Sequence, residues 1–130
     1  MNFRMTRIGD EPDLKDKLTE YLNNKWVEEK PNYLRSINDA IRARMILPQW
    51  YILLADEEVI GTAGVLENQI IGKPEFSPNI CSLYVEEEYK EEKIDDFIDF
   101  IYDDVAKAGI EVLYLVEDVI EVEEEFLEDF

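Results

Sequence analysis

The segment Tyr89–Asp96 reads Tyr-Lys-Glu-Glu-Lys-Ile-Asp-Asp and lies where a β-rich run gives way to apolar residues at helical spacing. Such a strand-to-helix junction commonly holds a phosphate, because the first amides of a helix are unpaired and the helix dipole favours an anion. Glycines in a phosphate loop let the backbone approach the ligand, and this segment contains none. It therefore predicts the architecture of a phosphate site with residue types that oppose phosphate binding.

The residue types that the chain lacks exclude several kinds of catalytic and metal site. The 130 residues include no histidine and a single cysteine, Cys81, which excludes a His-based triad, a zinc site and an internal disulfide. Cys81 falls inside an expected strand with no base nearby, which indicates a small buried residue and not a nucleophile. The acidic runs Glu86–Glu88 and Glu121–Glu125 lack the glycine and the spacing of a calcium loop, so no metal site is expected.

The charge balance limits the partners. The formal net charge is −19, from 32 acidic and 13 basic residues, which repels nucleic acid and anionic membranes and favours cationic partners. The longest apolar runs, Trp50–Ala55 and Val112–Val116, are much shorter than the ~20 residues of a membrane span. Met1–Asp10 has no secretory apolar region. We expect one cytoplasmic domain spanning residues 1–130, with no nucleic-acid or membrane partner.

Periodicity in the first half predicts a strand, two helices and a β-hairpin. Asp13 is a plausible cap for the first helix, and Pro31 stops it. A short acidic turn at Asp56–Glu58 joins the two strands of the hairpin. The expected elements are Asn2–Ile8, Asp13–Glu29, about Tyr33–Met45, Trp50–Ala55 and Val59–Leu66.

The second half predicts a parallel unit that encloses the Tyr89–Asp96 segment. A strand over Asn79–Val85 precedes it, and a helix with apolar positions from Ile94 to Ala108 follows and stops at Gly109. Glu111–Val116 is apolar on both faces, as in a central strand reached by a right-handed crossover, and about Ile120–Phe130 is expected to be a terminal helix. The fold class is therefore α/β: a mixed sheet with antiparallel N-terminal strands, one parallel β-loop-α-β unit and helices on both faces.

Several short strings occur in order and spacing from Leu47 to Leu115, just over half of the chain. They are Leu47-Pro48, Glu58–Ala63 (Glu-Val-Ile-Gly-Thr-Ala), Glu67-Asn68, Phe76–Val85 and Glu88–Asp95. Together with the order of elements, they resemble the GNAT superfamily of acetyl-CoA-dependent N-acetyltransferases. The resemblance implies transfer of an acetyl group from acetyl-CoA to a primary amine, carried by a small molecule or a peptide.

The same resemblance implies where the coenzyme would bind. Backbone groups of Leu83 and Val85 would pair with the pantetheine arm, and the amides of the following segment would cradle the pyrophosphate. That segment comprises Lys90, Glu91, Glu92, Lys93, Ile94 and Asp95. The family's three glycines fall on Glu91, Lys93 and Asp95, and its second arginine falls on Glu92. Acidic residues at this place also suit an ordinary helix start, where they are worth about 0.3–1 kcal/mol each, so a helix without a ligand is the alternative interpretation.

The resemblance supplies only weak catalytic candidates. No carboxylate base occupies the fourth strand, which leaves Glu67, Tyr84 or a water to accept the amine proton. The alternative interpretation is that Glu67 is a solvated loop residue and Tyr84 a packed strand aromatic. The best register of the tail places Leu127 where the family has a proton-donating tyrosine, and the family's last pair of strands has no counterpart.

Two functions of different classes are consistent with these residues. One is a GNAT-like N-acetyltransferase whose activity is impaired. The other is a non-catalytic, degenerate GNAT domain that serves as an acidic protein-interaction or ligand-sensing module, and it would take a basic protein as partner or form a homo-oligomer that covers an open sheet edge. A third hypothesis, a DNA mimic, requires carboxylates spaced like phosphates on one face.

Overall fold

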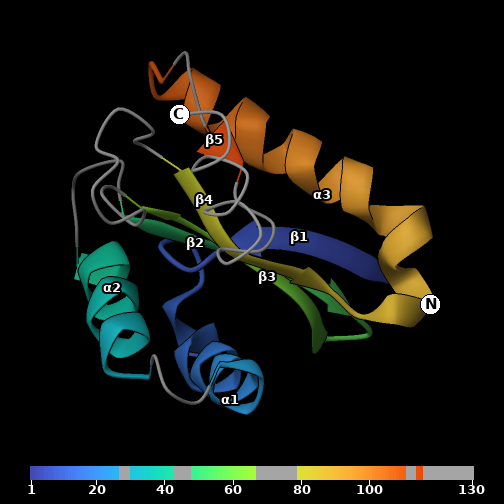
Figure 1. Cartoon of the computed structure of the whole chain (residues 1–130), viewed down its shortest axis with the longest axis horizontal. Helices are drawn as coiled ribbons and strands as arrows, with labels where there is room; N and C mark the ends of the chain where they lie inside the picture. Colours follow the sequence, from blue (N-terminus) through green and yellow to red (C-terminus); the bar gives the residue numbers. More distant parts are fainter. Residues whose placement is uncertain (27–29, 43–47, 67–78, 111–113, 116–130) are drawn as a thin grey trace, which may run out of the picture.

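A computed structural model of the protein describes residues 1–26, 30–42, 48–66, 79–110 and 114–115, and Figure 1 shows their arrangement. The strands lie in the sheet in chain order, antiparallel from the first to the fourth, and the fifth is parallel to the fourth. This confirms the predicted mixed sheet. The elements are β1 Phe3–Arg7, η1 Pro12–Leu14, α1 Lys15–Lys25, α2 Lys30–Arg42, β2 Gln49–Ala55, β3 Glu58–Leu66, β4 Asn79–Val85, α3 Glu87–Lys107 and β5 Tyr114–Leu115.

Helices cover both faces of the sheet, with α1 and α2 on one face and α3 on the other (Figure 1). Strand β2 shows the consequence, because every one of its residues is buried and successive side chains enter opposite cores. Trp50, Ile52 and Leu54 pack with α1 and α2, while Tyr51, Leu53 and Ala55 pack in the cluster that contains α3.

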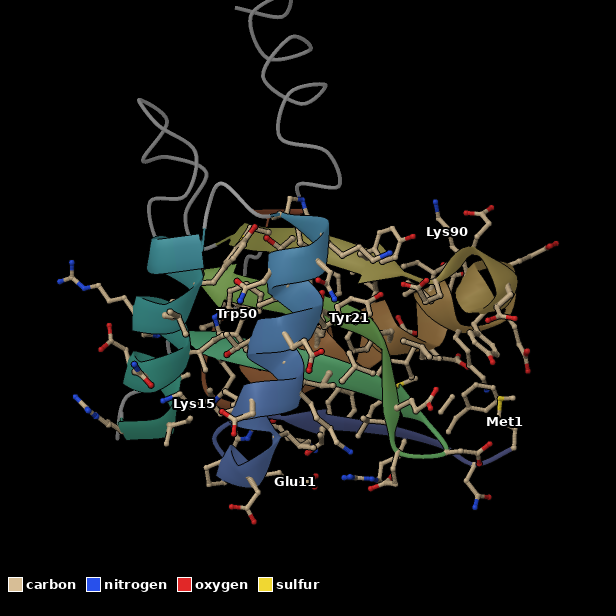
Figure 2. All side chains as sticks on the ribbon, turned by 90° about the horizontal axis from the view of Figure 1, so that it is seen from below. Met1, Glu11, Lys15, Tyr21, Trp50 and Lys90 are labelled. Atoms are coloured by element: carbon tan, nitrogen blue, oxygen red, sulfur yellow. The ribbon has the colours of Figure 1, made fainter. Side chains whose placement is uncertain are left out.

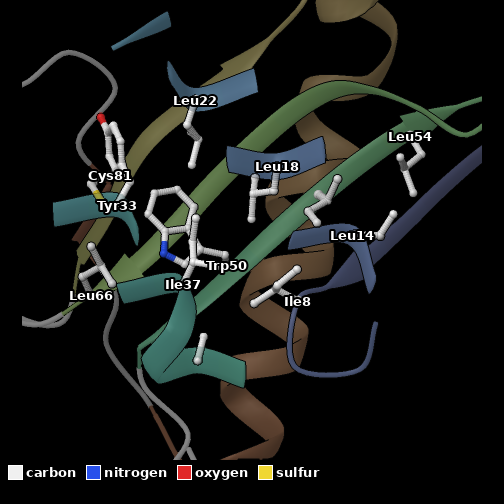
Figure 3. Packing of buried hydrophobic residues seen from close by; sticks show 12 residues of the cluster. Ile8, Leu14, Leu18, Leu22, Tyr33, Ile37, Trp50, Leu54, Leu66 and Cys81 are labelled. Carbon is white, nitrogen blue, oxygen red and sulfur yellow. The ribbon is translucent and has the colours of Figure 1, made fainter. Parts of the chain in front are cut away.

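Trp50 is the largest side chain of the core under α1 and α2, and Figure 3 shows it between Leu18, Leu22 and Ile37. Its ring lies flat against Gly64 on β3, where a Cβ would come within 2.9 Å of the ring. The indole N–H donates to Ser36 Oγ at 2.9 Å, so the polar atom of this buried ring is satisfied. The glycine that interrupts β3 is therefore explained by the close packing of Trp50.

The ends of several elements differ from the predictions. One 3₁₀ turn, Pro12–Leu14, precedes α1, so Asp13 lies within that turn and is not the helix cap. Helix α3 begins at Glu87, well before the expected Ile94, and ends as predicted before Gly109, which has φ +92°. The expected terminal helix Ile120–Phe130 lies outside the described residues. Within the described residues, no helix is long and apolar enough to cross a bilayer.

Helix α3 is fastened to the sheet by a polar network as well as by its apolar face. Tyr51 Oη on β2 donates to Asp104 Oδ2 on α3 at 2.7 Å, and Arg7 on β1 reaches the same carboxylate at 3.2 Å. Burial and this hydrogen bond raise the pKa of Tyr51. The carboxylate accepts from both partners, which fixes the position of α3 over β1 and β2.

Candidate functional site

Strand β4 carries a bulge at Ser82. The pairing of β3 with β4 shifts register between Thr62 and Gly64, and Ser82 has φ +51°, a value uncommon for residues other than glycine. Two side chains hold this conformation: Thr62 Oγ1 donates to the Ser82 carbonyl at 3.2 Å, and Tyr33 Oη lies 3.0 Å from Ser82 Oγ. The bulge is thus supported from β3 and from α2.

Beyond the bulge, one edge of β4 is open within the described residues. The parallel pairing with β5 joins Asn79 to Tyr114 and Ile80 to Leu115, and no described strand pairs with the rest of β4 on that side. The amide of Glu86 donates to Ile60 O on β3 at 2.8 Å. Because backbone groups alternate in direction along a strand, those of Leu83 and Val85 point away from β3, toward the open side.

The side chains of this part of β4 are distributed over both faces. Leu83 and Val85 are buried in the cluster that contains α3. Tyr84 faces α1, where its ring centroid lies 6.5 Å from that of Tyr21 and 6.2 Å from that of Trp26. Tyr84 is therefore packed with other aromatic rings, and its predicted role as a base stays a prediction.

The predicted pyrophosphate segment is helical. Lys90–Asp95 lie in the first turns of α3, so the amides of these residues bond to carbonyls four residues earlier in the same helix. The expectation that they form a loop was wrong, and the physical reason is the composition, because Glu and Lys are good helix formers and no glycine interrupts them. In the described part of the chain, the amides left over at the helix start are those of Glu87 and Glu88.

The charges around this helix start oppose an anion. The side chains of Glu87, Glu88, Glu91, Glu92 and Asp95 are exposed, while Ile94 packs in the cluster under α3. Lys93 turns inward, with Nζ 4.2 Å from the centroid of the Phe3 ring and 3.8 Å from Glu92 Oε1. Lys90 is exposed at the start of α3, as Figure 2 shows. A phosphate charge that came within 4 Å of one of these carboxylates would be repelled by roughly 4 kcal/mol at an effective dielectric of about 20.

The two regions that the resemblance assigns to acetyl-CoA therefore differ. On the side of β4 away from β3, no described strand pairs with the backbone groups of Leu83 and Val85. At the start of α3, the amides of Lys90–Asp95 are used in the helix, those of Glu87 and Glu88 are left over, and five exposed carboxylates oppose a diphosphate.

A polar cluster that sequence reasoning missed joins α1 to the end of β4. Tyr21 Oη donates to Glu86 Oε2, and Lys25 Nζ lies 3.2 Å from the same oxygen. Burial raises the pKa of Tyr21, and the bond to Glu86 raises it further. Burial alone would lower the pKa of Lys25, but its pairing with Glu86 and Tyr84 outweighs this, and the pKa is raised. Tyr21 and Glu86 are 65 positions apart, so no pattern of neighbouring residues predicts that they pair.

Cys81 and Glu67 are the other residues that the sequence analysis singled out. Cys81 is buried, as predicted. Glu67, the other predicted base, lies outside the described residues. Within the residues that the structure describes, no group of three or more His, Cys, Asp or Glu side chains could hold a metal ion.

Comparisons with known proteins give matches in structure. No family model matches the chain, and no curated protein matches it in sequence. The aminoglycoside acetyltransferase AAC(6')-Iy, in complex with the bisubstrate analogue CoA-S-monomethyl-acetylneamine, superposes with a TM-score of 0.70 at 10% identity, covering 99% of this chain and 88% of that one.

Two further solved structures of acetyltransferases are similar to this chain in fold. A predicted acetyltransferase with acetyl-CoA from Clostridium acetobutylicum has a TM-score of 0.58 at 15% identity, with 90% of this chain and 80% of that one covered. A GCN5-related N-acetyltransferase from Ralstonia eutropha has a TM-score of 0.53 at 12% identity, with 98% and 90% covered. At these identities the likeness shows the fold, and it confirms the predicted GNAT-like architecture.

Proposed function

We propose that this GNAT-fold domain transfers an acetyl group from acetyl-CoA to a primary amine, with coenzyme binding weakened at the diphosphate. One observation carries the proposal: within the described residues, no strand pairs with the outward-directed backbone groups of Leu83 and Val85, which follow the bulge at Ser82. An extended arm can pair with such an edge as an added strand does. The structures of AAC(6')-Iy with a CoA analogue and of the Clostridium protein with acetyl-CoA support the proposal by their shared fold.

The residues would have the following tasks. Acetyl-CoA, when bound, supplies an activated acetyl thioester. Leu83 and Val85 would hold the arm, and the exposed Lys90 would offer a positive charge to the phosphates. The reaction forms the bond between the amine nitrogen and the acetyl carbon and breaks the carbon–sulfur bond. Tyr84, Glu67 or a water would accept the amine proton, and the departing thiolate would take up a proton.

A second candidate function is a non-catalytic GNAT-fold module that binds a cationic ligand or a basic protein. The specific observation that favours it is the continuous helix from Glu87, which replaces a phosphate cradle with backbone hydrogen bonds and carboxylates. In that case the open edge of β4 would be a remnant of the fold, and the net charge of −19 would attract the partner.

Calorimetry with acetyl-CoA and with S-acetylpantetheine, which lacks the nucleotide diphosphate, tests the first candidate. We expect acetyl-CoA to bind with a Kd below about 1 mM, and Lys90→Glu to abolish binding by adding a negative charge beside the phosphates. Lys107→Glu, the same charge change at the other end of α3, is the matched control and should leave binding intact. Release of free thiol in the presence of a primary amine then reports transfer.

The result decides between the candidates. Absence of heat with both donors at high protein concentration would remove the acetyltransferase proposal and leave the non-catalytic module. Binding of S-acetylpantetheine without tighter binding of acetyl-CoA would show that the β4 edge accepts the arm and that the helix start contributes nothing.

A further inference from the structure

The ammonium group of Lys25 is held in a cage formed by a carboxylate and two aromatic rings. Lys25 Nζ lies 3.2 Å from Glu86 Oε2, 4.4 Å from the centroid of the Tyr84 ring and 5.6 Å from that of the Tyr21 ring. A carboxylate beside aromatic faces is the arrangement with which proteins recognise organic ammonium ions. The chain therefore places its own primary ammonium in an amine-binding environment.

The walls of the cage are held by contacts that do not involve Lys25. The hydroxyl of Tyr21 donates to Glu86 Oε2, and the amide of Glu86 donates to Ile60 O at 2.8 Å. Glu86 occupies the N-cap position of α3, yet its side chain makes no capping bond and is directed to α1. The Tyr84 ring meets Trp26 edge to face, with centroids 6.2 Å apart. Removal of the ammonium would leave these groups in place.

The cage opens on a cavity of about 550 Å³ between α1, the β2–β3 turn and the start of α3. Tyr21, Lys25 and Glu86 belong to its lining. Three more carboxylates border it, those of Asp56, Glu58 and Glu88. There is thus room beside the cage for a ligand, and the surrounding charge favours a cation.

Lys25 is placed to leave the cage. It is the last residue of α1, and its side chain remains 30% exposed. An ion pair with this exposure contributes little to stability, because water competes for both partners. Movement of this one side chain would vacate the cage without breaking the core of the domain.

We propose that Lys25 is a built-in occupant of an ammonium-binding site formed by Glu86, Tyr84 and Tyr21, and that an external aliphatic amine binds there once Lys25 moves out. The internal ammonium lowers the apparent affinity for the external one by the fraction of molecules in which the cage is vacant. If the proposed acetyl transfer holds, this is the place for the acceptor amine, on the face of β4 that Tyr84 occupies. Amine binding itself does not depend on the coenzyme.

The test compares n-butylamine binding to three proteins by NMR titration in the absence of coenzyme. Lys25→Met removes the internal ammonium and keeps an unbranched side chain, and we expect the dissociation constant to fall about tenfold. Lys15→Met, a matched change on the same helix, should bind as the wild type does. Addition of Glu86→Gln to Lys25→Met should weaken binding again, because the carboxylate is lost.

Equal affinity of Lys25→Met and wild type for n-butylamine would overturn the inference, as would tight binding that survives Glu86→Gln. Should the variants unfold, the wild type still decides, through the side-chain NMR signals of Lys25. Displacement of these signals by saturating n-butylamine supports the inference, and unchanged signals refute it. Because no coenzyme is present, failure here is distinct from failure to bind acetyl-CoA.

Discussion

The edge of β4 and the start of α3 are the two adjacent regions to which the proposed function assigns the coenzyme, yet they differ in what they offer it. At β4, the bulge at Ser82 is present, and no described strand pairs with the outward-directed backbone groups of Leu83 and Val85. At α3, the segment Lys90–Asp95 is regular helix. The first region has the geometry that the proposal needs, and the second does not.

The contrast follows from how each region would recognise its part of the ligand. A strand edge presents backbone groups whose direction is set by register, and many side chains tolerate the same register. A phosphate cradle needs amides that are not used elsewhere, so residues that favour helix remove it directly. A segment of helix-favouring residues without glycine therefore offers no cradle, whereas a strand edge persists as long as the sheet forms.

The largest effect is expected from the triple variant Glu91→Gly, Lys93→Gly, Asp95→Gly. Glycine destabilises a helix interior by about 1 kcal/mol relative to alanine, so this variant should be about 2–3 kcal/mol less stable than the corresponding triple alanine variant. Both variants remove the same side chains, including the Lys93 contact with Phe3. Chemical denaturation measures the difference, which reports the helix alone.

Coenzyme binding by the same two variants separates the effect of the helical backbone from the effect of the side-chain charges. Tighter acetyl-CoA binding than the wild type in the glycine variant only would show that the continuous helix is the obstacle. Tighter binding in both variants would assign the obstacle to the side chains, and no gain in either would mean that neither the helix nor these side chains limits binding.

A smaller loss of stability is expected from Gly61→Val, which acts on β4 from its paired side, on β3. A Cβ at Gly61 would lie 3.0 Å from the Tyr84 carbonyl oxygen and 3.2 Å from Val85 Cγ2. Overpacking of this kind costs about 2 kcal/mol, and here it also pushes β4 out of register. Val59→Ile, added bulk at a partly buried position of the same strand, is the control for denaturation. Unchanged stability of Gly61→Val would contradict the close β3–β4 contact.

Local patterns were sufficient to predict most of the fold. Two β-rich runs, Trp50–Ala55 and Val59–Leu66, with a short acidic turn between them predicted the hairpin, and its turn lies at Asp56 and Glu57, which have φ of 49° and 68°. The stop of α3 before Gly109 was also predicted. These features depend on residues within a few positions of one another, which the sequence displays directly.

The candidate site was harder to predict for two physical reasons. The start of α3 was expected to be a loop because its string aligns with a phosphate motif, whereas its Glu and Lys residues favour a helix from Glu87. The cage around Lys25 depends on how α1 lies across β4, a long-range arrangement that periodicity does not encode. The acidic run that begins at Glu86 and the ring of Tyr84 were the parts of this cage that the sequence analysis had noted.

Substitution of Ser82 measures the strain at the bulge in β4. Ser82→Ala keeps φ +51° and loses the contact with Tyr33, while Ser82→Gly loses the same contact and removes the penalty of a left-handed residue. The glycine variant should therefore be more stable than the alanine variant by about 1 kcal/mol in thermal or chemical unfolding. Equal stabilities would indicate that β4 relaxes to an extended strand when the side chain is lost.

The smallest effect is expected from Tyr21→Phe, which removes a hydrogen bond at Glu86, where the two regions meet. The loss should be about 1 kcal/mol at neutral pH. The folded-state pKa of Tyr21 is raised, so the stability that its neutral hydroxyl contributes is complete below the unfolded pKa of about 10 and declines as the pH rises above it. Urea unfolding of wild type and variant from pH 7 to pH 11 should show their difference shrinking above pH 10. A constant difference would mean that the hydroxyl ionises equally in both states, and the link from α1 to the junction of β4 and α3 would then be a packing contact alone.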